Sequence, residues 1–281
     1  MRICFCILFI LLYCFTTVLQ AKCVSIVISS PIKPYITLAD YIKKFSRLKV
    51  YSIILPDDEE DIAHNIKLLK HYKCEVILSI GYRAAKVVSK IENKNKIFSF
   101  VLYPFTDPNL YSKFACGITL NIPEYKLAEA CKKLEANPKV SIVYSDYRLH
   151  TYVDSIKKFI EGMGGCLISY RVRKNEDISK VLDNILERTD ILLLIPDPML
   201  SSEEIIEWIV FKAISKGKFV VGYNKFFWES GATAVLYINY KQTALKILDE
   251  INKLMETGKC ETVNAEYDIH IRREVQYKND E

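Results

Sequence analysis

The stretch that decides the fold runs from residue 190 to residue 259 and reads DILLLIPDPMLSSEEIIEWIVFKAISKGKFVVGYNKFFWESGATAVLYINYKQTALKILDEINKLMETGK. An unbroken apolar run, Ile191 to Ile195, ends in Pro-Asp-Pro, and an amphipathic helix pattern follows from Ser201. A second apolar run, Phe219 to Gly222, ends in Tyr-Asn, and another helix pattern precedes Gly258. Continuous apolar runs that alternate with helices are typical of parallel strands buried on both faces. The stretch therefore predicts part of a parallel α/β sheet.

The same alternation extends along almost the whole chain. It predicts further strands at residues 24–30, 50–55, 75–80, 97–102, 140–144 and 166–172. The alternation breaks at Gly117–Leu120, a short extended segment, and restarts at Asn121-Ile122-Pro123, where a proline stands in the first turn of a helix. The pattern predicts an α/β protein with doubly wound parallel sheets. Periodicity alone would allow two consecutive domains as well as two interleaved ones.

The first 21 residues have the composition of a secretory signal peptide. Arg2 supplies positive charge, residues 3–15 form a short apolar core, and Ala21 offers a small residue at the cleavage point. We therefore expect an exported protein, in the periplasm or at the outer face of the cytoplasmic membrane. Retention of the segment as an uncleaved anchor stays open. A lipid anchor on Cys23 is disfavoured, because the preceding Gln20-Ala21-Lys22 does not fit a lipobox.

Composition and motifs argue against several classes of function. The formal net charge of +5 is spread over 26% charged residues of both signs, without a basic cluster rich in aromatic residues, so we expect no nucleic-acid partner. The chain has no G-x-S-x-G, P-loop or G-x-G-x-x-G motif, and its four histidines are scattered. We therefore expect no catalytic residues, no metal site and no cofactor.

Candidate binding residues fall at the ends of predicted strands, where ligands bind in open parallel sheets. Gly81 opens a helix whose first backbone N–H groups, Tyr82 to Ala85, suit a carboxylate, and Arg83 can add a bidentate partner. Asp197, fixed between two prolines, is placed to accept an ammonium group. A tight turn at Gly81 and a helix-start acid at Asp197 are the structural alternatives. The expected ligand-binding set is Ser29, Ser30, Gly81, Tyr82, Arg83, Ala84, Tyr103, Ser145, Tyr147, Asp197 and Asn224.

One disulfide follows from the expected order of strands. Cys23 and Cys74 each stand one residue before a predicted strand, and in a sheet of order 2-1-3-4-5 these two strands are neighbours. Adjacent strands lie ~4.8 Å apart, within the Cα separation that a disulfide accepts. We therefore predict a bridge between Cys23 and Cys74. The pairing of Cys116, Cys131, Cys166 and Cys260 is left open.

Several short motifs, taken in order, resemble one protein family. They are ILSIGYRAAKVV at 77–88, KIFSFVLYP at 96–104, CGIT at 116–119, NPKVSIVYSD at 137–146, and the segments 190–197, 219–224 and 231–232. Together they resemble the tryptophan/tyrosine-type substrate-binding proteins of bacterial ABC importers. Two departures are Tyr103, where that family often has Asp, and Lys96, where it has Pro.

This resemblance implies a type I periplasmic-binding fold of two doubly wound parallel-sheet lobes. It places residues 22–118 plus 232–259 in the N-terminal lobe and residues 119–231 plus 260–281 in the C-terminal lobe, with about three crossovers between them.

The function implied is that of the extracytoplasmic solute-binding component of an ABC importer. Such a protein captures a small molecule, here an amino acid or related small carboxylate, in the cleft between lobes and presents it to an ABC permease. A ligand-sensing or interaction module of the same fold, coupled to a membrane signalling partner, is the alternative. We expect a monomer. Replacement of Asp197 by Ala is expected to weaken binding and to leave stability nearly intact.

Overall fold

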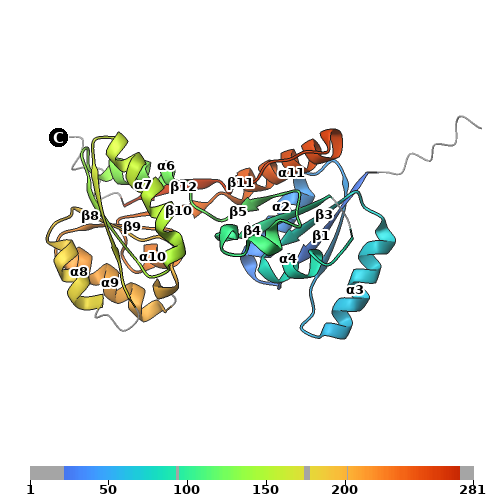
Figure 1. Ribbon diagram of the computed structural model, residues 1–281, viewed down its shortest axis with the longest axis horizontal. Coiled ribbons are helices and arrows are strands. Elements are labelled where there is room, and N and C mark those ends of the chain that lie inside the picture. Colours follow the sequence, from blue (N-terminus) through green and yellow to red (C-terminus); the bar gives the residue numbers. More distant parts are fainter. Residues whose placement is uncertain (1–21, 93–94, 174–177, 201, 273–281) are drawn as a thin grey trace, which may run out of the picture.

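The computed structural model describes residues 22–92, 95–173, 178–200 and 202–272. Within these residues the chain forms two α/β lobes that lie side by side (Figure 1). Each lobe contains one mostly parallel sheet with helices on both of its faces. The predicted fold class, two doubly wound lobes, is therefore confirmed.

The first lobe is built on a parallel sheet of order β11-β5-β4-β3-β1-β2 in the described part of the chain. Its strands β1 and β3 are buried throughout, as their unbroken apolar sequences require. The strands are β1 (Cys23–Ile28), β2 (Lys49–Ile54), β3 (Val76–Ile80), β4 (Lys96–Val101), β5 (Cys116–Thr119) and β11 (Val263–Asn264). The helices are α2 (Lys33–Phe45), α3 (Glu59–Tyr72), α4 (Tyr82–Val88), α5 (Pro108–Tyr111), α11 (Tyr240–Thr257) and the short 3₁₀ turn η1 (Pro104–Thr106).

The second lobe is built on a sheet of order β12-β10-β9-β8-β6-β7, in which β12 alone among the described strands runs antiparallel to its neighbour. The strands are β6 (Lys139–Tyr144), β7 (Cys166–Arg171), β8 (Ile191–Leu193), β9 (Phe219–Gly222), β10 (Ala234–Ile238) and β12 (Tyr267–Ile271). The helices are α6 (Glu124–Leu134), α7 (His150–Gly162), α8 (Ile178–Leu186), α9 (Glu203–Ser215) and α10 (Lys225–Glu229), with 3₁₀ turns η2 (Tyr147–Leu149) and η3 (Pro198–Leu200).

The chain crosses between the two lobes three times within the described residues: after β5, between β10 and α11, and between β11 and β12. This corrects the expected lobe boundaries at two places. Residues 234–238 belong to the second sheet, because β10 pairs with β9. Residues 263–264 belong to the first sheet, because β11 pairs with β5. Helix α11 packs on α2 in the first lobe, as expected for residues 240–257.

One apolar layer passes through the hinge without a break. In the first lobe it covers the face under α2 and α11, and in the second it covers the face under α6 and α7. Separate clusters fill the opposite faces, under α3 and α4 in the first lobe and under α8 and α9 in the second. The lobes are therefore joined by shared core as well as by the chain.

Two disulfides lie in the first lobe. Cys23 is bonded to Cys74, with their Cα atoms 4.9 Å apart, so the predicted bridge is confirmed. Cys116 is bonded to Cys260, with a Cα separation of 5.7 Å, a pairing that the sequence had left open. No helix in the described ranges is both long and apolar enough to cross a bilayer.

The Cys23–Cys74 bridge should stabilise the fold by limiting the freedom of the unfolded chain. It spans 51 residues, and a loop of that length corresponds to about 4 kcal/mol at most. We expect the double variant Cys23→Ser/Cys74→Ser to lose up to that amount of unfolding free energy in urea. Peptide mapping of the unreduced protein should recover the linked pair, and recovery of both as free thiols would contradict the assignment.

Candidate functional site

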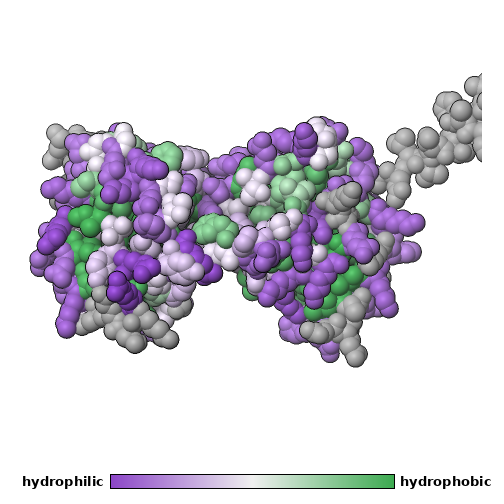
Figure 2. Space-filling view, in the orientation of Figure 1, coloured by the Kyte–Doolittle hydropathy of each residue, from purple (hydrophilic) through white to green (hydrophobic). Residues whose placement is uncertain are grey.

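The loops at the carboxyl ends of the strands meet between the lobes. Tyr103 follows β4 of the first lobe, and its hydroxyl donates a 2.9 Å hydrogen bond to the carbonyl of Pro196, which follows β8 of the second lobe. Figure 2 shows a hollow on either side of the narrow waist that joins the lobes. In open parallel sheets this is the position at which ligands bind. The candidate site is therefore the set of strand-end loops on either side of the Tyr103–Pro196 contact.

Tyr103 is fixed by both lobes. Its backbone has a φ of +50°, its N–H donates to Asn121 Oδ1 at 2.8 Å, and its ring packs edge-on to Tyr152 of α7, with ring centroids 5.6 Å apart. Burial, and to a lesser degree the nearby Tyr223 and Asp197, raise the pKa of Tyr103 far above its ordinary value, so the side chain is a neutral donor. Tyr103 therefore links the end of β4 to the first crossing and to the second lobe.

Asp197 holds two loops of the second lobe together. Its Oδ1 accepts hydrogen bonds from the hydroxyl of Ser145 at 2.6 Å and from Met199 N–H at 2.9 Å. Its Oδ2 accepts from the N–H groups of Ser145 at 2.9 Å and Asp146 at 3.2 Å. These four bonds occupy the carboxylate's usual acceptor positions. Asp197 therefore positions Ser145 and Asp146, rather than offering a free carboxylate to an ammonium group.

Asp146 and Arg148 form an ion pair at the end of β6. The guanidinium of Arg148 contacts both carboxylate oxygens of Asp146, at 2.9 Å, 3.0 Å and 2.6 Å. This pairing lowers the pKa of Asp146, so the acid stays ionised. Tyr223, which follows β9, is mostly buried, and burial together with Asp197 raises its pKa to about 12. Asp146, Arg148 and Tyr223 were not among the predicted residues, although each is adjacent in sequence to one that was.

In the first lobe, Gly81 makes a tight turn between β3 and α4 and packs against Ser29, which follows β1. Gly81 has a φ of +86°, and a Cβ there would lie 2.6 Å from Ser29 Oγ, so only glycine fits. Ser29 Oγ accepts the N–H of Ala84 at 2.8 Å, and the N–H of Ala85 bonds to the carbonyl of Gly81 at 3.1 Å. Two of the four donors proposed for a ligand carboxylate are therefore used inside the lobe.

Arg83 also serves the lobe itself. Its guanidinium donates to the carbonyl oxygens of Ser29 at 3.4 Å, Leu55 at 3.5 Å and Pro56, and contacts Asp57 Oδ1 at 3.4 Å. The side chain thereby fastens the loops after β1 and β2. The structure places it as a support for the strand ends, with its donors directed at carbonyl groups.

The remaining predicted residues divide into exposed and structural ones. Asn224 is exposed and caps α10, where its Oδ1 accepts the N–H groups of Phe226 and Phe227. Ala84 is fully buried, and Ser30 is partly exposed.

Large aromatic side chains are left exposed at the strand ends of both lobes. Tyr82, after β3, has 47% of its surface exposed, and Phe105, after β4, also has 47%. Tyr147, after β6 in the second lobe, has 67% exposed. Phe105 was not among the predicted residues. Exposed rings that follow strand ends in two neighbouring lobes are suited to contact the flat faces of a ligand.

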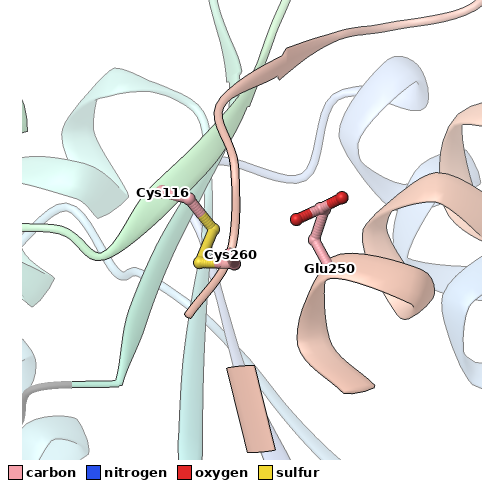
Figure 3. Close-up of side chains that lie close together, drawn as sticks. All are labelled: Cys116, Glu250 and Cys260. Atoms are coloured by element: carbon pink, nitrogen blue, oxygen red, sulfur yellow. A yellow bond between two sulfur atoms is a disulfide. The ribbon is translucent and has the colours of Figure 1, made fainter. Parts of the chain in front are cut away.

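A second cluster lies away from these strand ends. The sulfur atoms of Cys116 and Cys260 and a carboxylate oxygen of Glu250 lie within 4.8 Å of one another (Figure 3). The two sulfurs are bonded to each other, so neither is a thiolate that could bind a metal ion. In this state the cluster is a covalent link with an adjacent acid.

Comparison with solved structures agrees with the geometry of the fold. The chain is similar to a structure in complex with L-Trp from Streptococcus pneumoniae, described as an ABC domain, at 15% identity over 92% of this chain and 94% of that chain, with a TM-score of 0.56. It is similar to the ligand-free, open structure of a substrate-binding protein with adhesive properties from Clostridium difficile, at 13% identity over 91% and 94%, with a TM-score of 0.70.

It is also similar to a solute-binding protein in complex with D-arabinose from Burkholderia graminis, at 11% identity over 90% and 96%, with a TM-score of 0.52. These structures are type I periplasmic-binding proteins, and this chain has their fold. Protein-family models and curated protein sequences gave no match.

Asp197 yields a prediction that differs from the one made on sequence. Replacement by Ala would leave the partly buried N–H groups of Ser145, Asp146 and Met199 without their acceptor, so we expect unfolding free energy to fall by about 2–4 kcal/mol. The matched control is Asp57→Ala, whose side chain is fully exposed and which should change stability by about 0.5 kcal/mol or less. Urea denaturation measures both, and equal stabilities for the two variants would contradict the role given to Asp197.

Proposed function

We propose that the protein is an exported solute-binding protein that captures a small aromatic carboxylate, such as an aromatic amino acid, between its lobes and delivers it to an ABC permease. The observation that carries the proposal is the set of exposed rings that follow strand ends in both lobes, Tyr82 and Phe105 from the first lobe and Tyr147 from the second. Leaving such rings in water is unfavourable, and a ligand with a flat apolar face would cover them.

The polar groups around the rings support a charged or polar ligand. The Asp146–Arg148 pair presents both signs of charge at the end of β6, and Arg148 has about half of its side chain exposed. Asp197 accepts hydrogen bonds from Ser145 and Asp146, so this polar loop is already ordered without a ligand. A preformed site loses less conformational entropy on binding than one that must be ordered.

Export is supported by the cysteines. The described part of the chain contains two disulfides, and such bonds persist mainly in oxidising compartments. The expected signal peptide, residues 1–21, lies outside the described residues.

A ligand-sensing module of the same fold is the second candidate. It is favoured by the similarity to a chain of a mutant XylFII–LytSN complex, at 11% identity over 90% of this chain and 99% of that chain, with a TM-score of 0.63. Both candidates require a ligand between the lobes, and they differ in the membrane partner. The partner that co-purifies with the ligand-bound protein from membranes, permease or kinase, distinguishes them.

The ligand class is tested by a thermal-shift screen with amino acids, aromatic carboxylates and sugars. A ligand present at ~100 times its dissociation constant should stabilise the protein by about 2.7 kcal/mol. We expect aromatic carboxylates to give the shift. A shift with sugars alone would exclude the proposed ligand class, and no shift with any compound would contradict small-molecule binding.

Calorimetric titration of the best ligand tests the rings directly. We expect Tyr147→Ala to bind about tenfold more weakly, because a ring face is lost from one side of the ligand. Phe159→Ala is the matched control, since Phe159 is a similarly exposed ring, 44%, on α7 of the same lobe. Equal affinities for the two variants would remove Tyr147 from the site.

A further inference from the structure

The Cys116–Cys260 disulfide joins β5 to the segment before β11, the two first-lobe strands from which the first and third crossings depart, and it lies at the amino ends of these strands. Cys116 is the first residue of β5, and β5 leads through residues 120–123 to α6 of the second lobe. Cys260 stands between α11 and β11, and β11 leads through residues 265–266 to β12 of the second lobe. The bond therefore holds together the strands that lead into the first and third crossings, although the two cysteines are 144 residues apart.

Strand β11 is short, and it is supported by Thr262 Oγ1, which accepts the N–H of Gly117 at 3.2 Å, and by Lys246, which donates to the carbonyl of Asn264 at 3.2 Å. It has two residues, which pair with Ile118 and Thr119 at the edge of the sheet. Thr119 Oγ1 donates to Asn264 Oδ1 at 2.6 Å, and the N–H of Ala265 donates to the carbonyl of Thr119 at 2.8 Å. A two-residue edge pairing opens readily by itself. The covalent link three residues before β11 keeps the pairing in register.

Glu250 also holds the loop that precedes β11. It lies on α11, it is only 3% exposed, and its carboxylate accepts the N–H of Glu261 and the ammonium of Lys253, each at 2.8 Å. Figure 3 shows the carboxylate beside the disulfide, with Cys260 between α11 and β5. The loop before β11 is thus attached to α11 by a hydrogen bond and to β5 by a covalent bond.

We propose that the Cys116–Cys260 disulfide is a redox-sensitive clamp on the hinge. While it is intact, the first and third crossing segments leave the first lobe as one rigid pair, and bending is confined to residues 120–123 and 265–266. A dithiol reductant breaks the S–S bond by transferring two electrons and two protons; it forms the Cys116 and Cys260 thiols and becomes a disulfide itself. Strand β11 is then free to lose its register with β5. The third crossing, which follows β11, becomes more mobile, and the lobes sample a wider range of orientations.

The geometry allows a reductant to reach this bond. Cys260 is partly exposed and borders a surface hollow that is also lined by Ala115, Lys253 and residues 257–259 and 261. The other disulfide offers a comparison within the same lobe, because Cys23 and Cys74 join β1 to the segment before β3, two strands from which no crossing departs.

Hydrogen–deuterium exchange measured by mass spectrometry tests the clamp without a ligand. In the Cys23→Ser/Cys74→Ser protein, dithiothreitol can reduce only the hinge bond among the two described disulfides. We expect the reductant to accelerate exchange of residues 260–267 by about tenfold or more and to leave β8, in the core of the second lobe, unchanged. The control is Cys116→Ser/Cys260→Ser, in which the same segment should exchange fast with or without reductant.

Two results would overturn the proposal. One is an exchange rate of residues 260–267 that does not respond to reductant in the Cys23→Ser/Cys74→Ser protein. The other is acceleration that spreads equally to β8, which would show that the bond supports the whole fold. If the Cys23→Ser/Cys74→Ser protein does not fold, the oxidised wild type is compared with Cys116→Ser/Cys260→Ser, and the same two segments decide the outcome.

Discussion

The structure depends on the apolar layer that continues from one lobe into the other through the hinge. The crossing segments lie outside the strands, so backbone carbonyl groups buried there need other donors. Two tyrosines of the second lobe supply them: Tyr152 donates to the carbonyl of Ile122 at 2.5 Å, and Tyr267 donates to that of Leu120 at 2.7 Å. The rings fill the shared core while the hydroxyls satisfy the first crossing segment. This arrangement keeps the lobes together and still leaves their outer edges free to separate.

In the candidate site, as in the hinge, polar side chains hold segments of the chain in position. Arg83, Ser29 and Asp197, the residues with the strongest polar groups, are engaged in holding strand-end loops. The side chains left exposed after the strand ends include the rings of Tyr82, Phe105 and Tyr147, and Arg148 of the ion pair with Asp146. A site built in this way selects a ligand by shape and by ring contact first, and the supporting residues affect binding by keeping the loops in position.

Much of this fold follows from the sequence, because strands buried on both faces must be continuous apolar runs. The neighbouring positions of β1 and β3 also follow, and with them the Cys23–Cys74 bridge. The Cys116–Cys260 bridge does not, since it depends on β11, whose two residues carry no periodic pattern. The assignment of residues 234–238, which form β10, to the first lobe was wrong for a similar reason. Their apolar run fits either sheet, and pairing with β9 places them in the second.

The role of Asp197 could not be predicted because its partners lie about fifty positions away in sequence and meet it only when β6 and β8 pair. The exposed rings were predicted in part. Tyr82 and Tyr147 directly follow predicted strand ends, whereas Phe105 stands beyond a turn that sequence patterns do not place.

The central claim is that a small molecule binds between two lobes that move about three short crossings. Small-angle X-ray scattering of the protein with and without the ligand identified by thermal shift tests it most directly. We predict that the radius of gyration falls when the ligand is present at saturation, because the lobes close on it. An unchanged radius of gyration, with calorimetry confirming that the ligand is bound, would contradict the account.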